Sequence, residues 1–200
     1  MENANVRLSP EELELVQDAN VILTKNAVME KAKLLLAGVS GQAQQQLAHA
    51  GPLLFGSPQT PPRISRGENY LGLPWVAMDY PRVFEQQGVS AIRHIFLWGK
   101  HFCCTWHCSG VYKEHAVQAV LAGHAYFSEK NWLLYTGSDE WAHEWNQHHV
   151  HTGSLTPTEF AAILNRQHFF KLCKYLPLSR WNETTDFYTN CLEELINIPV

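Results

Sequence analysis

Apolar residues recur at helical spacing over the first forty residues of the chain. One helically spaced set is Leu13, Val16, Ala19 and Leu23, and another is Ala27, Ala32, Leu35 and Leu36. Residues 9–12 read Ser-Pro-Glu-Glu, which supplies a hydroxyl cap, a proline in the first turn and acids at the positive end of the helix. The pattern predicts a helix that begins at Pro10, and Gly38 and Gly41 predict its end or a break.

Strand-like sequence follows in the middle of the chain. Leu73–Tyr80 is apolar and ends at a proline, and residues 89–98 and 101–108 both alternate between apolar and polar side chains. Between these two runs lies Gly99–Lys100, and glycine at the first central position favours a two-residue type II′ turn. The sequence therefore predicts a hairpin with Trp98 opposite His101.

This register sorts the hairpin side chains into two faces. The face predicted to point into the core carries Ala91, Arg93, Ile95, Leu97, Phe102, Cys104, Trp106 and Cys108. The other face, here called the mixed face, carries Ile92, His94, Phe96, Trp98, His101, Cys103, Thr105 and His107. Because the mixed face is half polar and half aromatic, we expect a helix, a loop or a ligand to cover it.

The second half of the chain is mainly helical in pattern. Residues 112–127 read as a helix, 131–136 as a strand and 138–153 as a polar loop or short helix. A capping-box pattern at Thr156–Glu159 begins another predicted helix, whose apolar side extends to Leu176 and which Pro177 ends. A last helix is expected from about residue 179 to residue 198.

The order of these elements predicts an α+β fold. Strands and helices do not alternate regularly, so we expect an antiparallel sheet, including the 89–98/101–108 hairpin, packed with N-terminal and C-terminal helices. We expect one globular domain over residues 1–200. Residues 51–67 hold a cluster of prolines and glycines and form a long predicted loop within that domain.

Composition and charge argue against nucleic acid and membranes as binding partners. The chain is 46% hydrophobic and 17% charged, with a formal net charge of −4, and no run of Lys or Arg suggests contact with nucleic acid or a membrane surface. No apolar stretch reaches the roughly 18 to 20 residues that span a bilayer. Residues 1–5 do not resemble a signal peptide, so we expect a cytoplasmic protein. Its five cysteines, an odd number, are expected to be free thiols.

Residues 63–82 are rich in side chains that orient polar ligands. Arginine binds anions, aromatic rings form pocket walls, and one or two carboxylates fix orientation. The predicted ligand-binding residues, together with one histidine from the mixed face, are Arg66, Glu68, Tyr70, Trp75, Asp79, Arg82 and His94. This hypothesis requires Arg66, Asp79, Arg82 and His94 to line one concavity. Alternatively, Asp79 and Arg82 form an ion pair that holds a structural turn.

A histidine-rich segment, residues 141–151, suggests a transition-metal site. Glu144 and His148 are four positions apart and would share one face of a helix, while His143 needs a loop or a break to join them. The HExxH motif is absent because residue 147 is Gln. The metal hypothesis predicts a hydrolase or an oxygenase, and its alternative is an exposed polar segment.

Three functions therefore remain open from the sequence. The favoured hypothesis is a binding module for a small polar or anionic ligand. The second is the metal-dependent enzyme, for which His94, Cys103 and His107 of the mixed face are further candidate side chains. The third is a protein-interaction domain whose mixed face forms a homodimer. A Cys-His nucleophile is not supported, since nothing in the sequence would lower the pKa of a thiol.

Overall fold

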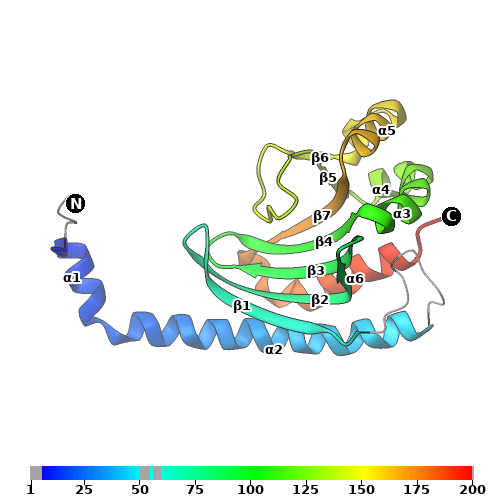
Figure 1. Ribbon diagram of the computed structural model, residues 1–200. Helices are drawn as coiled ribbons and strands as arrows, with labels where there is room; N and C mark the ends of the chain where they lie inside the picture. Colours follow the sequence, from blue (N-terminus) through cyan, green and yellow to red (C-terminus); the bar gives the residue numbers. More distant parts are fainter. Residues whose placement is uncertain (1–5, 50–54, 56–59, 200) are drawn as a thin grey trace.

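The computed structural model describes residues 6–49, 55 and 60–199, and its centre is a seven-stranded antiparallel sheet (Figure 1). The strands lie in the order β1-β2-β3-β4-β7-β5-β6. Their bounds are β1 Arg63–Tyr70, β2 Leu73–Glu85, β3 Gly88–Leu97, β4 His101–Ser109, β5 Leu133–Tyr135, β6 His149–His151 and β7 Phe169–Pro177. Together with the helices, this sheet confirms the predicted α+β fold.

The helices lie on one face of the sheet and at one end of it (Figure 1). Their bounds are α1 Pro10–Gln17, α2 Ala19–His49, α3 Gly110–Ala122, α4 His124–Glu129, α5 Pro157–Arg166 and α6 Thr184–Ile196, with 3₁₀ turns at Thr152–Ser154 and Leu178–Glu183. α2 and α6 cover one face, and α3, α4 and α5 gather near one end. No helix among the described residues is long and apolar enough to cross a membrane.

The N-terminal helical region begins as predicted but breaks at another place. Ser9 caps α1 in a capping box with Glu12. The chain then turns at Asp18, which is extended (φ −92°, ψ 95°), and α2 continues without interruption through Gly38 and Gly41. The predicted end at these glycines is wrong, because each glycine costs a helix only about 1 kcal/mol. Packing of the buried side of α2 on the sheet outweighs that cost.

The helix predicted from residue 156 to Pro177 is half wrong. The capping box of Thr156 with Glu159 is present, but α5 ends at Arg166. Residues 169–177 form β7, a strand between β4 and β5. Because β7 is buried on both faces over most of its length, its apolar residues do not alternate, and such a run cannot be told from a helix by periodicity.

The β3–β4 hairpin is present, but its predicted register is wrong by one residue. The turn has three residues instead of two, so Leu97 and not Trp98 lies opposite His101. The N–H of Lys100 donates to the carbonyl oxygen of Leu97 (3.1 Å), and Gly99 between them takes a positive φ of 67°, as a type II turn requires. A one-residue slip exchanges which side chains of the two strands share a face.

The corrected register creates one polar and one apolar face. Arg93 and Ile95 share a face with the polar residues of β4, which are His101, Cys103, Thr105 and His107. This face of β2, β3, β4 and β7 is here called the polar face. His94 and Phe96 instead lie on the face under α2 and α6, among the core residues. Apart from Gly88 and Arg93, the strand residues of the hairpin are buried, so the structure gives no support to the homodimer predicted through the mixed face.

The long Pro/Gly-rich loop is shorter than predicted. β1 begins at Arg63, and its pairing with β2 was not expected from the sequence. Residues 51–54 and 56–59 of the predicted loop lie outside the described residues. Phe55 packs edge-to-face on Trp106 with 5.1 Å between ring centroids.

His94 is a histidine of the core. Its side chain is fully buried, and its ring meets Tyr188 edge-on with 4.6 Å between centroids. Among the described residues neither ring nitrogen finds a hydrogen-bond partner of normal geometry. Burial lowers the pKa of His94 to about 3, and the Met78 backbone opposes this shift only in part.

We predict that His94→Leu makes the fold less sensitive to acid. A folded-state pKa below the unfolded value near 6.5 gives stability that is complete above pH 6.5 and is lost as the pH falls toward 3. At about 1.4 kcal/mol per pH unit, the wild type should lose about 3 kcal/mol more than the variant between about pH 7.5 and pH 4.5. Urea unfolding at both pH values measures this difference. His148→Gln, which removes an exposed imidazole, should lose as much stability as the wild type.

Candidate functional site

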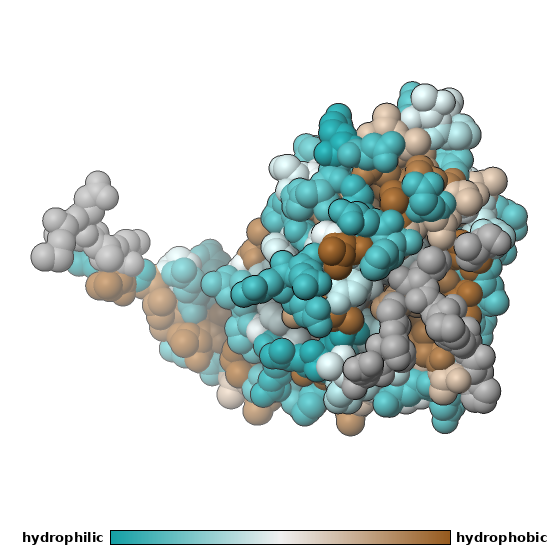
Figure 2. Space-filling view, turned by 45° about the vertical axis from the view of Figure 1, so that its right-hand side comes forward, coloured by the Kyte–Doolittle hydropathy of each residue, from teal (hydrophilic) through white to brown (hydrophobic). Residues whose placement is uncertain are grey.

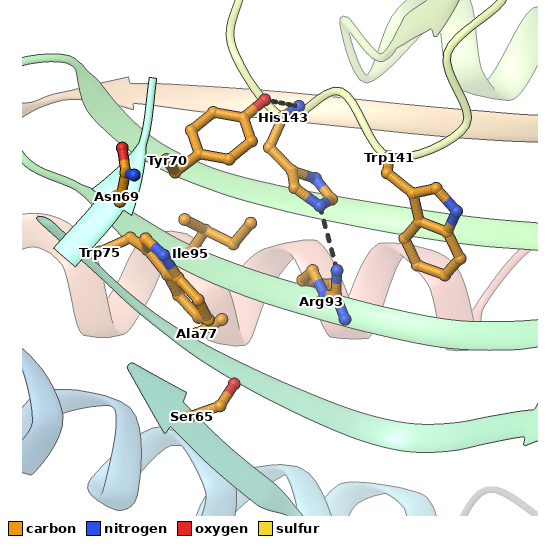
Figure 3. A pocket seen from close by; sticks show the side chains of 9 residues that line it. All are labelled: Ser65, Asn69, Tyr70, Trp75, Ala77, Arg93, Ile95, Trp141 and His143. Carbon is orange, nitrogen blue, oxygen red and sulfur yellow. Dashed lines mark hydrogen bonds between the residues drawn. The ribbon is translucent and has the colours of Figure 1, made fainter. Parts of the chain in front are cut away.

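The candidate site is a cavity of about 330 Å³ on the polar face, beneath residues 136–148 (Figure 3). These residues are here called the covering loop. The cavity is lined by Ser65, Asn69, Tyr70, Trp75, Ala77, Arg93, Ile95, Trp141 and His143. In Figure 3, Tyr70 and Trp75 lie on one side and Trp141 on the other, with Arg93 and His143 between them. Aromatic walls thus surround two polar side chains.

Arg93 is held in place by a bidentate ion pair. Its Nε and one Nη donate to the two carboxylate oxygens of Asp79, at 2.6 and 3.0 Å. Asp79 is directly opposite Arg93 in the β2–β3 register and is only 4% exposed. The guanidinium also lies near the rings of Phe84 and Trp141, 5.6 and 5.9 Å from their centroids. The rigid pair fixes the direction in which Arg93 offers its remaining N–H groups.

His143 is a neutral imidazole whose tautomer can be assigned. Burial first, and then the positive charges of Lys171 and Arg93, hold its pKa well below the usual value. The other Nη of Arg93 lies 3.0 Å from Nε2 of His143, and a guanidinium can only donate. Nε2 is therefore the acceptor, so Nδ1 carries the hydrogen. Among the described residues this buried Nδ1–H has no acceptor.

The backbone of His143 is also fixed. Its N–H donates to the hydroxyl of Tyr70 (2.6 Å), and its carbonyl oxygen lies 3.2 Å from Nε2 of His101. The covering loop thus contacts both β1 and β4 at this residue. The unpartnered Nδ1–H consequently belongs to a well-anchored ring.

Lys171 fastens the covering loop from below. Its side chain is almost completely buried, and Nζ donates to the backbone carbonyl oxygens of Glu140 (3.2 Å) and Ala142. Nζ also lies 4.4 Å from the ring centroid of Tyr135. Burial lowers the pKa of Lys171. The ammonium therefore acts on backbone groups of the loop and contributes positive potential beside the cavity.

Glu140 provides a second anchor for the loop. One carboxylate oxygen lies 2.8 Å from Nε2 of His107, and the other lies 3.2 Å from Nε2 of His168. The hydrogen bond from His107 lowers the pKa of Glu140 to about 2, while burial lowers the pKa of His107. The pair is consequently a carboxylate that accepts a hydrogen bond from a neutral imidazole.

Cys103 adds no nucleophile to the site, whereas burial at Cys173 is outweighed by hydrogen bonds from Cys103 and His149, which hold the pKa of Cys173 well below its usual value. All five cysteines are free and buried, as predicted. On the polar face, Sγ of Cys103 and Oγ1 of Thr105 lie 3.1 Å apart, and Thr105 donates to Cys173 at 3.6 Å. Burial raises the pKa of Cys103, which keeps this thiol protonated and unreactive.

The structure separates the predicted ligand-binding residues. Tyr70 and Trp75 line the cavity, and Asp79 lies directly behind Arg93. His94 is on the opposite face of the sheet, so the predicted single concavity is wrong.

The remaining charged residues of that prediction have partners outside the cavity. Arg66 pairs with Glu30 of α2 at 2.8 Å, and Glu68 pairs with Lys25 at 2.5 Å. Nε of Arg82 donates to the carbonyl oxygen of Pro61, 3.0 Å away. The alternative ion pair between Asp79 and Arg82 is also wrong, because Asp79 pairs with Arg93.

The predicted metal ligands do not converge. Nε2 of His143 faces Arg93, Glu144 forms an ion pair with Lys100 at 2.5 Å, and His148 is exposed. Across the described part of the chain, no three His, Cys, Asp or Glu side chains form a group that could hold a metal ion. The geometry therefore gives the predicted metal-dependent enzyme no support.

Several residues of the cavity were not predicted as site residues. The strand pattern predicts Arg93 in the core because it shares a strand face with Ile95, although a charged residue in an apolar strand is itself a signal that a partner is needed. Trp141 was seen only as part of the histidine-rich segment. Ser65 and Asn69 lie on β1, which was not recognised as a strand.

Comparisons of the chain with protein-family models, with curated proteins and with solved structures find no match. The chemistry of the site must therefore be inferred from its own side chains.

We predict that Lys171→Met loosens the covering loop. The substitution leaves two loop carbonyls without their buried donor, and a buried unsatisfied polar group costs about 1–3 kcal/mol. Backbone amides of residues 138–148 should exchange with deuterium much faster, as measured by mass spectrometry. The matched control is Lys100→Met, which removes the partly exposed ion pair with Glu144 and should cost less than about 1 kcal/mol. Equal exchange in both variants would contradict an anchoring role for Lys171.

Proposed function

We propose that this protein is a binding module for a small planar molecule that carries a carboxylate or a similar anionic oxygen. The observation that supports this proposal best is the buried Nδ1–H of His143, a donor without an acceptor among the described residues, in the wall of an aromatic cavity. Leaving such a donor unpaired costs about 1–3 kcal/mol, and a ligand oxygen that displaced the groups covering Nδ1 would remove that cost.

The electrostatic surroundings of His143 favour an anion over a cation. The charged side chains that lower its pKa most, Lys171 and Arg93, are both cations. Burial is the larger cause of the lowered pKa, and Lys171 and Arg93 add positive charge beside the imidazole, which Asp79 offsets in part at Arg93. Arg93 uses three of its N–H groups on Asp79 and His143 and retains others for an acceptor. A carboxylate could accept from His143 with one oxygen and from Arg93 with the other.

The walls of the cavity favour a flat, largely apolar body. Tyr70, Trp75 and Trp141 contribute aromatic rings, and Ala77 and Ile95 contribute the apolar floor. Aromatic side chains stack on planar ligands with a gain of about 0.5–1.5 kcal/mol beyond the area buried. A volume of about 330 Å³ is at the small end of ligand sites, which suits one or two fused rings.

The proposal is tested with four compounds that separate shape from charge. Benzoate and naphthoate are planar anions, benzyl alcohol is planar and uncharged, and cyclohexanecarboxylate is anionic and not planar. At about ten times its Kd, a ligand stabilises the fold by about 1.4 kcal/mol, which raises Tm by about 3–5 °C for a chain of this size. We expect this rise for the planar carboxylates alone, measured by thermal shift and by saturation-transfer NMR. Failure of all four to bind at millimolar concentration would overturn the proposal.

Gly67→Val should weaken binding by displacing Trp75, one wall of the cavity. Gly67 lies opposite Trp75, and a Cβ at Gly67 would lie only 2.5 Å from the indole Nε1, so a larger side chain must displace the ring. We expect a loss of affinity of at least tenfold for benzoate, measured by NMR titration. Gly38→Ala, where a Cβ meets no atom within 4 Å among the described residues, is the control and should bind normally. Normal binding by Gly67→Val would place the ligand elsewhere.

A further inference from the structure

The N-terminal arm, residues 6–24, projects beyond the body of the protein (Figure 1). It comprises α1 and the beginning of α2, and α1 buries none of its residues. An eight-residue helix is only marginally stable in water without tertiary contacts. Packing against the rest of the chain therefore does not account for the helical structure of α1.

The arm also concentrates the exposed apolar surface of the chain. Eight of the thirteen large apolar side chains exposed in the described residues lie between residues 6 and 23, namely Val6, Leu8, Leu13, Leu15, Val16, Val21, Ile22 and Leu23. In Figure 2 this apolar surface appears as brown patches along the projecting arm. Exposed apolar surface gathered in one place is typical of an interaction site.

The exposed apolar surface of the arm continues along the outer side of α2. Leu23 and Leu34 are eleven positions apart, about three helical turns, and are 63% and 69% exposed. Ala27 and Glu30 lie between them on the same side, and Lys31 and Lys33 border this side. The outer side of α2 is thus apolar at Leu23, Ala27 and Leu34 and is interrupted by Glu30, which pairs with Arg66 and Lys33.

We propose that the arms of two copies of this chain pair antiparallel about a two-fold axis and form a homodimer. The distribution of charge supports a second copy as the partner. Residues 7–18 carry Arg7, Glu11, Glu12, Glu14 and Asp18, one positive and four negative charges with a net charge of −3, and residues 25–33 of α2 carry Lys25, Glu30, Lys31 and Lys33, three positive charges and one negative with a net charge of +2. A two-fold interface must be complementary to itself. Antiparallel pairing places the acidic part of each arm against residues 25–33 of the other copy's α2, whereas parallel pairing would oppose like charges.

The first test is the oligomeric state of the full chain by sedimentation velocity over about 1–200 µM. We expect a dimer for the wild type and a monomer for Leu23→Glu, whose exposed position allows the fold to remain intact, as checked by circular dichroism. The control is Trp145→Glu, which is 56% exposed on the covering loop, on the other side of the sheet from α2, and should remain dimeric. A wild-type monomer at every concentration would overturn the proposal, and so would a dimer unaffected by Leu23→Glu.

The second test examines the antiparallel arrangement by charge reversal. One variant carries Glu11→Lys and Glu14→Lys, and the other carries Lys31→Glu and Lys33→Glu. Each alone should dimerise at least tenfold more weakly than the wild type, because like charges then face each other at both ends of the interface. An equimolar mixture should restore a heterodimer, since each arm again meets its opposite charge. A mixture that remains monomeric would overturn the antiparallel arrangement.

Discussion

The bidentate ion pair between Arg93 and Asp79 is the interaction on which the polar face depends. The two side chains lie directly opposite each other on β2 and β3, and Asp79 is almost fully buried. Removing two charges from water costs several kcal/mol each unless their geometry and hydrogen bonding are good, and breaking such a pair costs about 3–5 kcal/mol. Once Arg93 is fixed, its remaining Nη determines the tautomer of His143 and hence which ring nitrogen carries the hydrogen.

The two faces of the sheet are covered by different kinds of structure. α2 and α6 cover the apolar face with interlocking side chains, and His94 is neutral there because nothing compensates a charge. A loop covers the polar face, attached through Lys171 and Glu140. A loop held at a few polar points fills space less completely than a packed helix does. The cavity therefore lies under the loop, on the polar face.

Features that depend on neighbouring residues could be predicted from the sequence. The site could not, because it depends on contacts between residues far apart in the chain. Both capping boxes, the hairpin strands and the last helix depend on neighbouring residues, and they are present. The exact length of the turn at Gly99 depends on the pairing of whole strands, and its error of one residue moved Arg93 away from His101 and His107. The site also needs contacts between residues far apart in the sequence, such as Arg93 with His143, and no spacing in the chain predicts them.

The way in which Lys171 holds the covering loop has a consequence for how sequences of this type can diverge. The ammonium binds main-chain carbonyls at positions 140 and 142, which every amino acid supplies. Side chains such as those of residues 138 and 147 can therefore be substituted during evolution without loss of the hydrogen bonds from Lys171. An insertion or deletion between the two carbonyls would instead move both acceptors away from a buried charge, so in this loop length is expected to be selected more strictly than composition.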